Sequence, residues 1–155
     1  MKFSSPQDLY IEQLKDLHSA ETQLTKALPK MAKAATAPEL RTAFTAHLKE
    51  TEEQLLHLNQ IGENLGESLD DHTCATLEGL IEEGAEWMEE DAELIAAAQR
   101  VEHYEIAGYS IVHNFAEVLG EEEAAELSAE TLEEEEAADA KLTALAQSIN
   151  VAAEA

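Results

Sequence analysis

The sequence predicts an all-α fold, and three observations lead to that prediction. The chain has 155 residues, 45% hydrophobic but only 5% aromatic, and it is rich in the helix-favouring residues Ala, Leu and Glu. Leucines and other apolar residues recur at the three- and four-residue spacing of an amphipathic helix. Only three prolines and six glycines interrupt this pattern. We therefore expect a single helical domain over residues 1–150.

Four long helices are expected to account for most of the chain. Ser5 followed by Pro6 is typical of a helix start, because serine caps a helix and proline suits its first turn. Pro29 should kink the first helix or end it late. Pro38 suits the start of the second helix, and Gly120 suits the end of the third. The predicted helices cover residues 6–34, 38–65, 91–119 and 121–149, with a frayed tail at 151–155.

A long connection separates the second predicted helix from the third. It contains a loop, GESLDDHTC, followed by a shorter amphipathic helix expected at residues 75–89. The other two connections are short, so the helices that they join should be antiparallel neighbours. One long helical crossover between the second and third long helices is the ferritin-like arrangement of a four-helix bundle.

The chain is strongly acidic, with 34 Asp and Glu residues against nine Lys and Arg and a formal net charge of −25. Such a surface repels nucleic acid and anionic lipid, so we expect neither as a partner. The single cysteine, Cys74, excludes an intrachain disulfide and a cysteine-rich metal site. The sequence has neither a signal-peptide pattern nor a run of about 18 apolar residues, which predicts a cytoplasmic protein outside the membrane.

Several carboxylates fall on or beside the helix faces that should be buried. One on each long helix lies near the middle of that helix, and the four midpoints of an antiparallel bundle meet at one level. These four are Glu21, Glu50, Glu105 and Glu135, and Glu102 and Asp139 flank them. Three further polar residues lie near the same faces: His47, Gln54 and Tyr109.

Each of these side chains, taken alone, has an ordinary explanation. A single inward-pointing glutamate is often a hydrogen-bonded or edge residue, and His47 alone would be a satisfied core histidine. Together they are costly, because two bare carboxylates about 5 Å apart repel by roughly 3 kcal/mol at an effective dielectric near 20. Burial adds several kcal/mol per charge. Several such charges would exceed the net stability of a small domain, which is about 5–15 kcal/mol.

A positive counterpart is therefore required in the core. Lys and Arg fall on the flanks of the predicted helices rather than on their inner faces. Protons would neutralise part of the cluster, and two divalent cations would neutralise it outright. Oxygen-rich sites suit Fe and Mn better than Cu, so we expect two divalent ions, Fe or Mn.

Four segments resemble the YciE/YciF family of ferritin-like stress proteins: ELIAAAQRVEHYEIAGY, LEGLIEEG, DLHSAETQLTKALPKMAKAA and HLKETEEQ. The resemblance covers nearly the whole chain, from about Leu9 to Leu145. It implies a ferritin-like bundle with a carboxylate-bridged dinuclear metal site, a tendency to form homodimers and a link to stress response. The ligands that it implies are Glu21 on the first helix, Glu50 as a bridge on the second, Glu102 and Glu105 on the third, and Glu135 as a bridge on the fourth.

The chain departs from the usual ferritin-like pattern at two histidines. Typical sites carry Glu-x-x-His on the second and fourth helices, whereas here Glu53 and Ala138 occupy those positions. His47, one turn before Glu50, is a candidate replacement. Gln54 and Asp139 are candidates for the remaining coordination or for outer hydrogen bonds to the ligands.

Two functions follow from this pattern. The first is a di-iron or di-manganese oxidoreductase that reacts with O₂ or peroxide, with ferroxidase, peroxidase or catalase-like chemistry. The second is a metal-binding or metal-stabilised stress protein without turnover. A purely structural bundle, whose inner acids are protonated or exposed at an edge, is a third reading.

Overall fold

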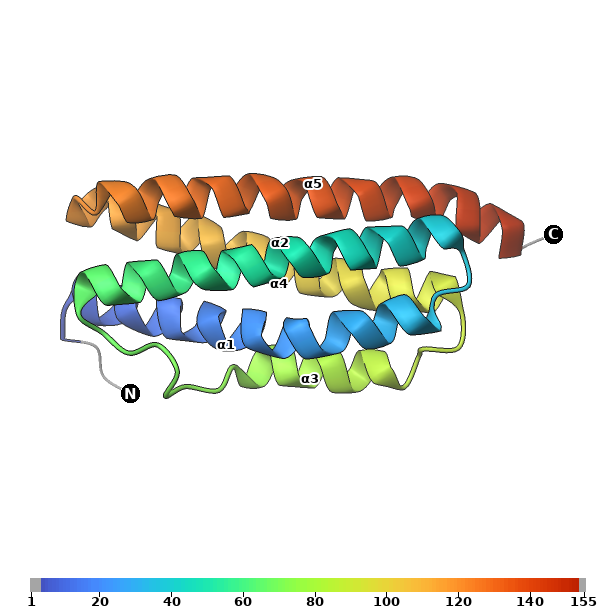
Figure 1. The fold of residues 1–155 in the computed structure, drawn as a ribbon, viewed down its shortest axis with the longest axis horizontal. Helices are drawn as coiled ribbons and strands as arrows, with labels where there is room; N and C mark the ends of the chain where they lie inside the picture. The colour runs from blue at the N-terminus through green and yellow to red at the C-terminus, as the bar shows by residue number, and fades with distance from the viewer. Residues whose placement is uncertain (1–3, 154–155) are drawn as a thin grey trace.

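The computed structural model describes residues 4–153, and every regular element in that part of the chain is a helix. Four long helices lie side by side, and a shorter one runs along one flank of the bundle (Figure 1). The all-α class and the helical crossover are therefore confirmed. The helices are α1 Pro6–Ala34, α2 Pro38–Leu65, α3 Ala75–Ala85, α4 Asp91–Leu119 and α5 Glu122–Ala153.

Three predicted helix ends differ from the structure: the end of α3 and both ends of α5. Helix α3 ends at Ala85 rather than at residue 89, because the chain turns there through a bond from the Trp87 N–H to the Gly84 carbonyl. Pro29 lies inside α1 on an exposed side, and the helix ends five residues later, at Ala34, as predicted. Helix α5 begins at residue 122 and continues to Ala153, so the tail predicted to fray is helical that far, and residues 154–155 lie outside the described chain.

The helices pair as the short connections require. Helix α1 packs along α2, and α4 packs along α5. Contacts of α1 with α4 and of α2 with α5 close the bundle (Figure 1). Helix α3 packs on α4 and α1, so the crossover covers the flank away from α2 and α5.

The apolar core is divided into two clusters, one toward each end of the bundle. The first cluster includes Leu28, Phe44 and Leu94, and the second includes Leu14 and Leu58. Buried polar side chains lie between them at the middle of the long helices. This division places the polar layer where the sequence analysis predicted the helix midpoints to meet.

The start of α2 is capped by a residue from another helix. Its N-cap, Ala37, has no capping side chain. The Asp91 carboxylate accepts hydrogen bonds from the N–H groups of Thr36, at 2.7 Å, and Ala37, at 2.8 Å. Because Asp91 is the first residue of α4, this contact fixes the two helix starts to one another.

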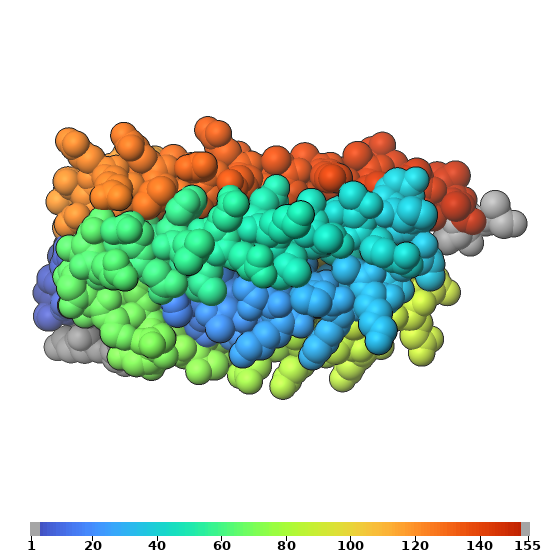
Figure 2. Space-filling model, in the orientation of Figure 1, coloured from blue at the N-terminus to red at the C-terminus, as the bar shows by residue number. Residues whose placement is uncertain are grey.

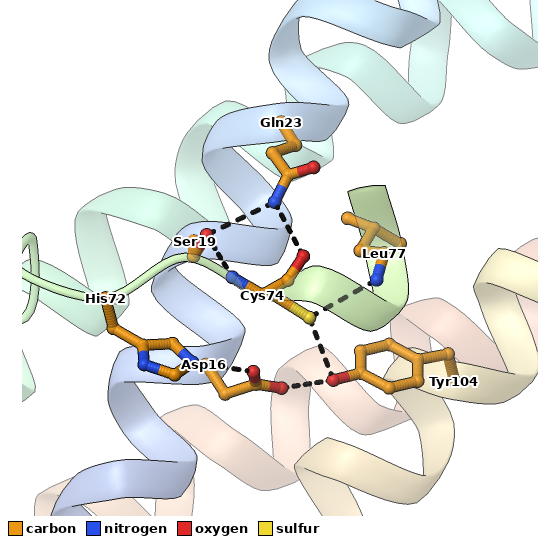
Figure 3. A network of polar contacts seen from close by, with 7 residues as sticks. All are labelled: Asp16, Ser19, Gln23, His72, Cys74, Leu77 and Tyr104. Atoms are coloured by element: carbon orange, nitrogen blue, oxygen red, sulfur yellow. Dashed lines mark hydrogen bonds and ion pairs between the residues drawn. The ribbon is translucent and has the colours of Figure 1, made fainter. Parts of the chain in front are cut away.

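A polar network attaches the crossover to α1 and α4 (Figure 3). The Cys74 N–H donates to Ser19 Oγ at 2.9 Å, and Cys74 Sγ lies 3.0 Å from the Tyr104 hydroxyl. That hydroxyl donates to Asp16, which His72 also contacts at 3.1 Å. Burial raises the pKa of the Cys74 thiol, so this cysteine is a protonated structural contact at neutral pH.

None of the helices within residues 4–153 combines the length and the apolar character needed to cross a lipid bilayer.

Candidate metal centre

The layer between the two apolar clusters draws side chains from all four long helices. Each is less than one-tenth exposed. The members are Glu21 from α1; His47, Thr51 and Gln54 from α2; Glu102 and Glu105 from α4; and Ser128, Thr131 and Glu135 from α5. Below, this set is called the polar layer. Four of the six carboxylates singled out in the sequence lie in it.

Four members of the polar layer converge on one point. His47, Glu102, Glu105 and Glu135 each present a ligand-type atom, and these atoms all lie within 4.8 Å of one another. His47 Nε2 lies 3.3 Å from Glu102 Oε1 and 3.6 Å from Glu135 Oε2. The histidine expected only as a replacement or outer residue thus lies directly among the carboxylates.

Glu21 approaches the same layer from α1 and is held by a tyrosine. Its Oε1 accepts a 2.6 Å hydrogen bond from the Tyr109 hydroxyl, and both side chains are buried. Tyr109 is on α4, one turn beyond Glu105, so α4 contributes both a carboxylate and the donor that orients one. Tyr109, which the sequence placed near the buried helix faces, is thus a core residue whose hydroxyl bonds a carboxylate.

Glu50 lies at the outer side of the four-residue group. Its side chain is 45% exposed, and its Oε2 lies 3.1 Å from His47 Nδ1. A carboxylate on one imidazole nitrogen fixes the ring and leaves the other nitrogen aimed at the centre. The structure therefore gives Glu50 the position of an orienting partner to His47, whereas the resemblance implied a bridging ligand.

Asp139 and Gln54 form other contacts. Asp139 accepts a hydrogen bond from Gln99 at 3.2 Å and lies 3.2 Å from the exposed His103 ring, so it faces α4 at the surface. The Gln54 amide donates to Glu134 at 2.8 Å, while its carbonyl oxygen stays buried without a partner. Asp139 is not in the polar layer, and Gln54 is.

The sequence analysis did not single out Ser128, Thr131 and Glu134. Ser128 and Thr131 lie seven and four residues before Glu135, so they share its helix face. That spacing is the signal that could have identified them. Glu134 gave no such signal, because it is rotated by about 100° from Glu135 around the helix and so lies off the buried face.

The polar layer contains many atoms that lack a hydrogen-bond partner, a costly arrangement in a protein core. A bound cation is the natural partner for carboxylate oxygens and an imidazole nitrogen, so the donor set fits divalent metal. The unpaired ligand-type atoms are Glu21 Oε2, His47 Nε2, Glu102 Oε2 and both carboxyl oxygens of Glu105 and of Glu135.

The pKa values of the buried groups also show that this layer is unfavourable for charged carboxylates without a cation. Burial, and then the charge of Glu135, raise the pKa of Glu21 to about 8. Burial raises the pKa values of Glu102 and Glu105 well above their ordinary range. Burial by itself would lower the pKa of His47, but its bond to Glu50 and the surrounding carboxylates raise it to about 10. The metal-free layer therefore holds protons at neutral pH, and cations would displace them.

Comparison with known proteins places this chain in a family. A family model described as a domain of unknown function, DUF892, matches residues 5–155. The chain is 46% identical over 163 aligned positions to protein YciF of Escherichia coli strain K12, with 99% of this chain and 98% of YciF covered.

Solved structures agree with that match. The crystal structure of the E. coli stress protein YciF matches with a TM-score of 0.88 and 46% identity over 93% of this chain and 96% of that chain. YcfI from Rhodopseudomonas palustris matches with a TM-score of 0.84 and 37% identity over 92% of this chain and 98% of that one. The chain therefore belongs to the DUF892 family, and the resemblance to the YciE/YciF stress proteins is confirmed.

Proposed function

We propose that this protein binds two divalent metal ions, Fe or Mn, in the polar layer and uses them in a stress-related redox reaction with O₂ or peroxide. One observation carries the proposal: His47, Glu102, Glu105 and Glu135 bring ligand atoms within 4.8 Å in a buried site where most of those atoms have no other partner. Such a cluster is tolerable with bound cations and strained without them.

The ligand set divides by position. His47, Glu102, Glu105 and Glu135 would hold the first ion, and Glu21 with the neighbouring carboxylates would complete a second. One nitrogen among carboxylate oxygens suits Fe and Mn. Glu50 and Tyr109 orient His47 and Glu21, the role that hydrogen-bond partners of metal ligands usually have.

The protein residues supply the environment for the reaction. When bound, the ions would supply or accept the electrons exchanged with O₂ or peroxide. The two apolar clusters exclude bulk water from both ends of the layer. Burial raises the pKa values of Glu102 and Glu105 well above their ordinary range, which favours their protonated forms in the metal-free layer. The Tyr109 hydroxyl keeps Glu21 Oε1 fixed, so its free oxygen points to one place.

A metal-binding stress protein without turnover is the second candidate. Ferritin-like sites usually have a metal-bridging carboxylate at the position of Glu50. Here the Glu50 side chain is half-exposed and orients His47, so one expected bridging ligand is absent, which favours a protein without turnover. Homodimer formation, a cytoplasmic location and the choice among ferroxidase, peroxidase and catalase-like chemistry remain predictions.

The test combines metal analysis with turnover. Purified protein loaded with Fe(II) or with Mn(II) should hold about two ions per chain, and should oxidise Fe(II) or consume peroxide. Glu105→Ala should lose both properties, and Glu136→Ala, which removes an exposed neighbour of Glu135, should retain them. Metal-dependent stabilisation without turnover would select the non-catalytic candidate. Wild-type protein that binds no metal would refute both.

A further inference from the structure

A cavity of about 340 Å³ lies between α2 and α5, beside the polar layer. The two helices run next to each other on the face seen in Figure 2. Small side chains account for the space, because facing alanines leave little to fill the gap between the helices. The walls are Ala43, Phe44 and Ala46 from α2 and Ala137, Ala138 and Leu142 from α5.

The inner end of this groove reaches the candidate metal centre. His47 and Glu102 both line it, and they are only 6% and 3% exposed. His47 Nε2 and Glu102 Oε2 have no hydrogen-bond partner. Two residues that carry buried, unpaired ligand atoms therefore line the cavity, while α3 covers the flank on the other side of the bundle.

The outer end of the groove is negatively charged. Glu50, Glu130, Glu133 and Glu134 line it together with one cation, Lys141. Glu130 and Glu133 are exposed, and Glu50 and Glu134 are half-buried. A cleft with low-dielectric walls and one sign of charge concentrates counter-ions and speeds their arrival. The exposure of the lining carboxylates thus decreases from the solvent side of the groove toward the buried His47 and Glu102.

We propose that the groove between α2 and α5 is the port through which a hydrated divalent cation reaches the polar layer, with Glu130 and Glu133 binding it transiently at the mouth. This inference rests on the proposed metal-binding function. It assigns a task to residues that the metal centre does not use as ligands. It also explains why the cavity is larger than a bare ion requires, since a divalent cation arrives with coordinated water.

A steric block tests the port directly. Ala137 is an exposed wall residue, and Ala140 is an exposed alanine on the same helix outside the groove. Co(II), followed by its visible absorption after rapid mixing with metal-free protein, reports metal uptake without turnover. We expect Ala137→Phe to slow uptake about tenfold with an unchanged final absorbance, and Ala140→Phe to behave as wild type.

A charge test uses the mouth residues. Glu130→Gln with Glu133→Gln should slow Co(II) uptake several-fold at low salt, and the difference should vanish at high salt. The control pair, Glu126→Gln with Glu136→Gln, removes the same charge from exposed positions of α5 that do not line the groove.

The outcomes separate the two proposals. Equal uptake rates for Ala137→Phe and Ala140→Phe, with wild-type protein binding Co(II), would refute the port and leave the metal centre intact. A lost final absorbance in Ala137→Phe would also refute it, because the residue would then affect the centre itself. Wild-type protein that takes up no Co(II) would refute the metal-binding function from which the port follows.

Discussion

The Tyr109 hydroxyl donates a 2.6 Å hydrogen bond to Glu21 Oε1 in the interior of the bundle, where both residues are almost fully buried. This bond joins α4 to α1 at the level of the candidate metal centre. It lowers the pKa of Glu21 against the opposing effects of burial and of the Glu135 charge. Tyr109, together with the charge of His47, therefore makes a charged Glu21 more tolerable.

Tyr109→Phe should weaken both the fold and metal binding. The substitution leaves Glu21 Oε1 without its donor, which should cost about 1–2 kcal/mol of unfolding free energy in the metal-free protein. Loss of an orienting partner should reduce metal affinity about 10- to 100-fold. Urea unfolding and a metal titration measure the two effects. Tyr10→Phe is the matched control, because the buried Tyr10 hydroxyl has no hydrogen-bond partner; equal effects of the two substitutions would contradict the assignment.

The stability of the metal-free protein should fall as the pH rises. Folding raises the pKa of Glu21 from 4.5 to about 8 and that of His47 from 6.5 to about 10. For both groups, the folded state binds more protons than the unfolded state at any pH between the unfolded-state pKa and the folded-state pKa. The stabilisation from the bound proton is therefore complete below the unfolded-state pKa and is lost as the pH rises through the folded-state pKa. Thermal unfolding between about pH 6 and about pH 9 should show a falling Tm, which saturating metal should largely restore. A Tm that rises over this range in metal-free protein would show that the layer is not protonated as described.

Glu105→Gln should separate stability from metal binding. Glutamine keeps nearly the same shape and is neutral without a proton, whereas the buried Glu105, whose pKa is raised by burial, must take up a proton when the metal-free protein folds. We expect the metal-free variant to gain about 1–4 kcal/mol of stability above neutral pH, because its folding no longer carries the free-energy cost of protonating a buried carboxyl group. Added Fe(II) or Mn(II) should then no longer raise its Tm.

The control for that experiment is Glu136→Gln, an exposed position on α5. It should keep the wild-type Tm and the wild-type response to metal. If Glu105→Gln still responds to metal as wild type does, the ions bind elsewhere.

Asp91→Ala should destabilise the bundle through the start of α2. The substitution removes the acceptor for the N–H groups of Thr36 and Ala37, and α2 has no capping side chain of its own. Loss of a helix cap typically costs about 1–2 kcal/mol. Urea unfolding measures the change, and Asp70→Ala, in an exposed part of the crossover loop, should cost much less. Equal costs would show that the cap contributes little.

Helix periodicity predicted most of this fold, and local packing explains the differences. The bounds of α1, α2 and α4 match the sequence prediction. Proline at the starts of α1 and α2, and glycine after the ends of α2 and α4, mark four of these six ends. Trp87 and Met88 continued the apolar pattern of α3, yet the chain already turns at those residues. Ile149 packs against the apolar core near the end of α5, which supports helix where an alanine-rich tail alone predicted fraying.

Helix periodicity predicted which carboxylates lie in the interior, but it did not predict the contacts that each of them makes. A helical wheel gives the direction of a side chain, and this placed Glu21, Glu105 and Glu135 correctly in the interior. A helical wheel does not give the level of a side chain along the bundle axis or the residues that it contacts. Asp139 is only one turn from Glu135, but that turn carries it about 6 Å along the axis, where it meets Gln99 and His103.

Anomalous scattering from crystals loaded with Fe(II) or Mn(II) tests the central claim most directly. Data collected at the absorption edge of the metal should show two peaks in the polar layer, each with oxygen or nitrogen atoms of His47, Glu102, Glu105, Glu135 or Glu21 about 2.0–2.6 Å away. A crystal soaked in excess metal that shows no anomalous peak in that layer would contradict the account.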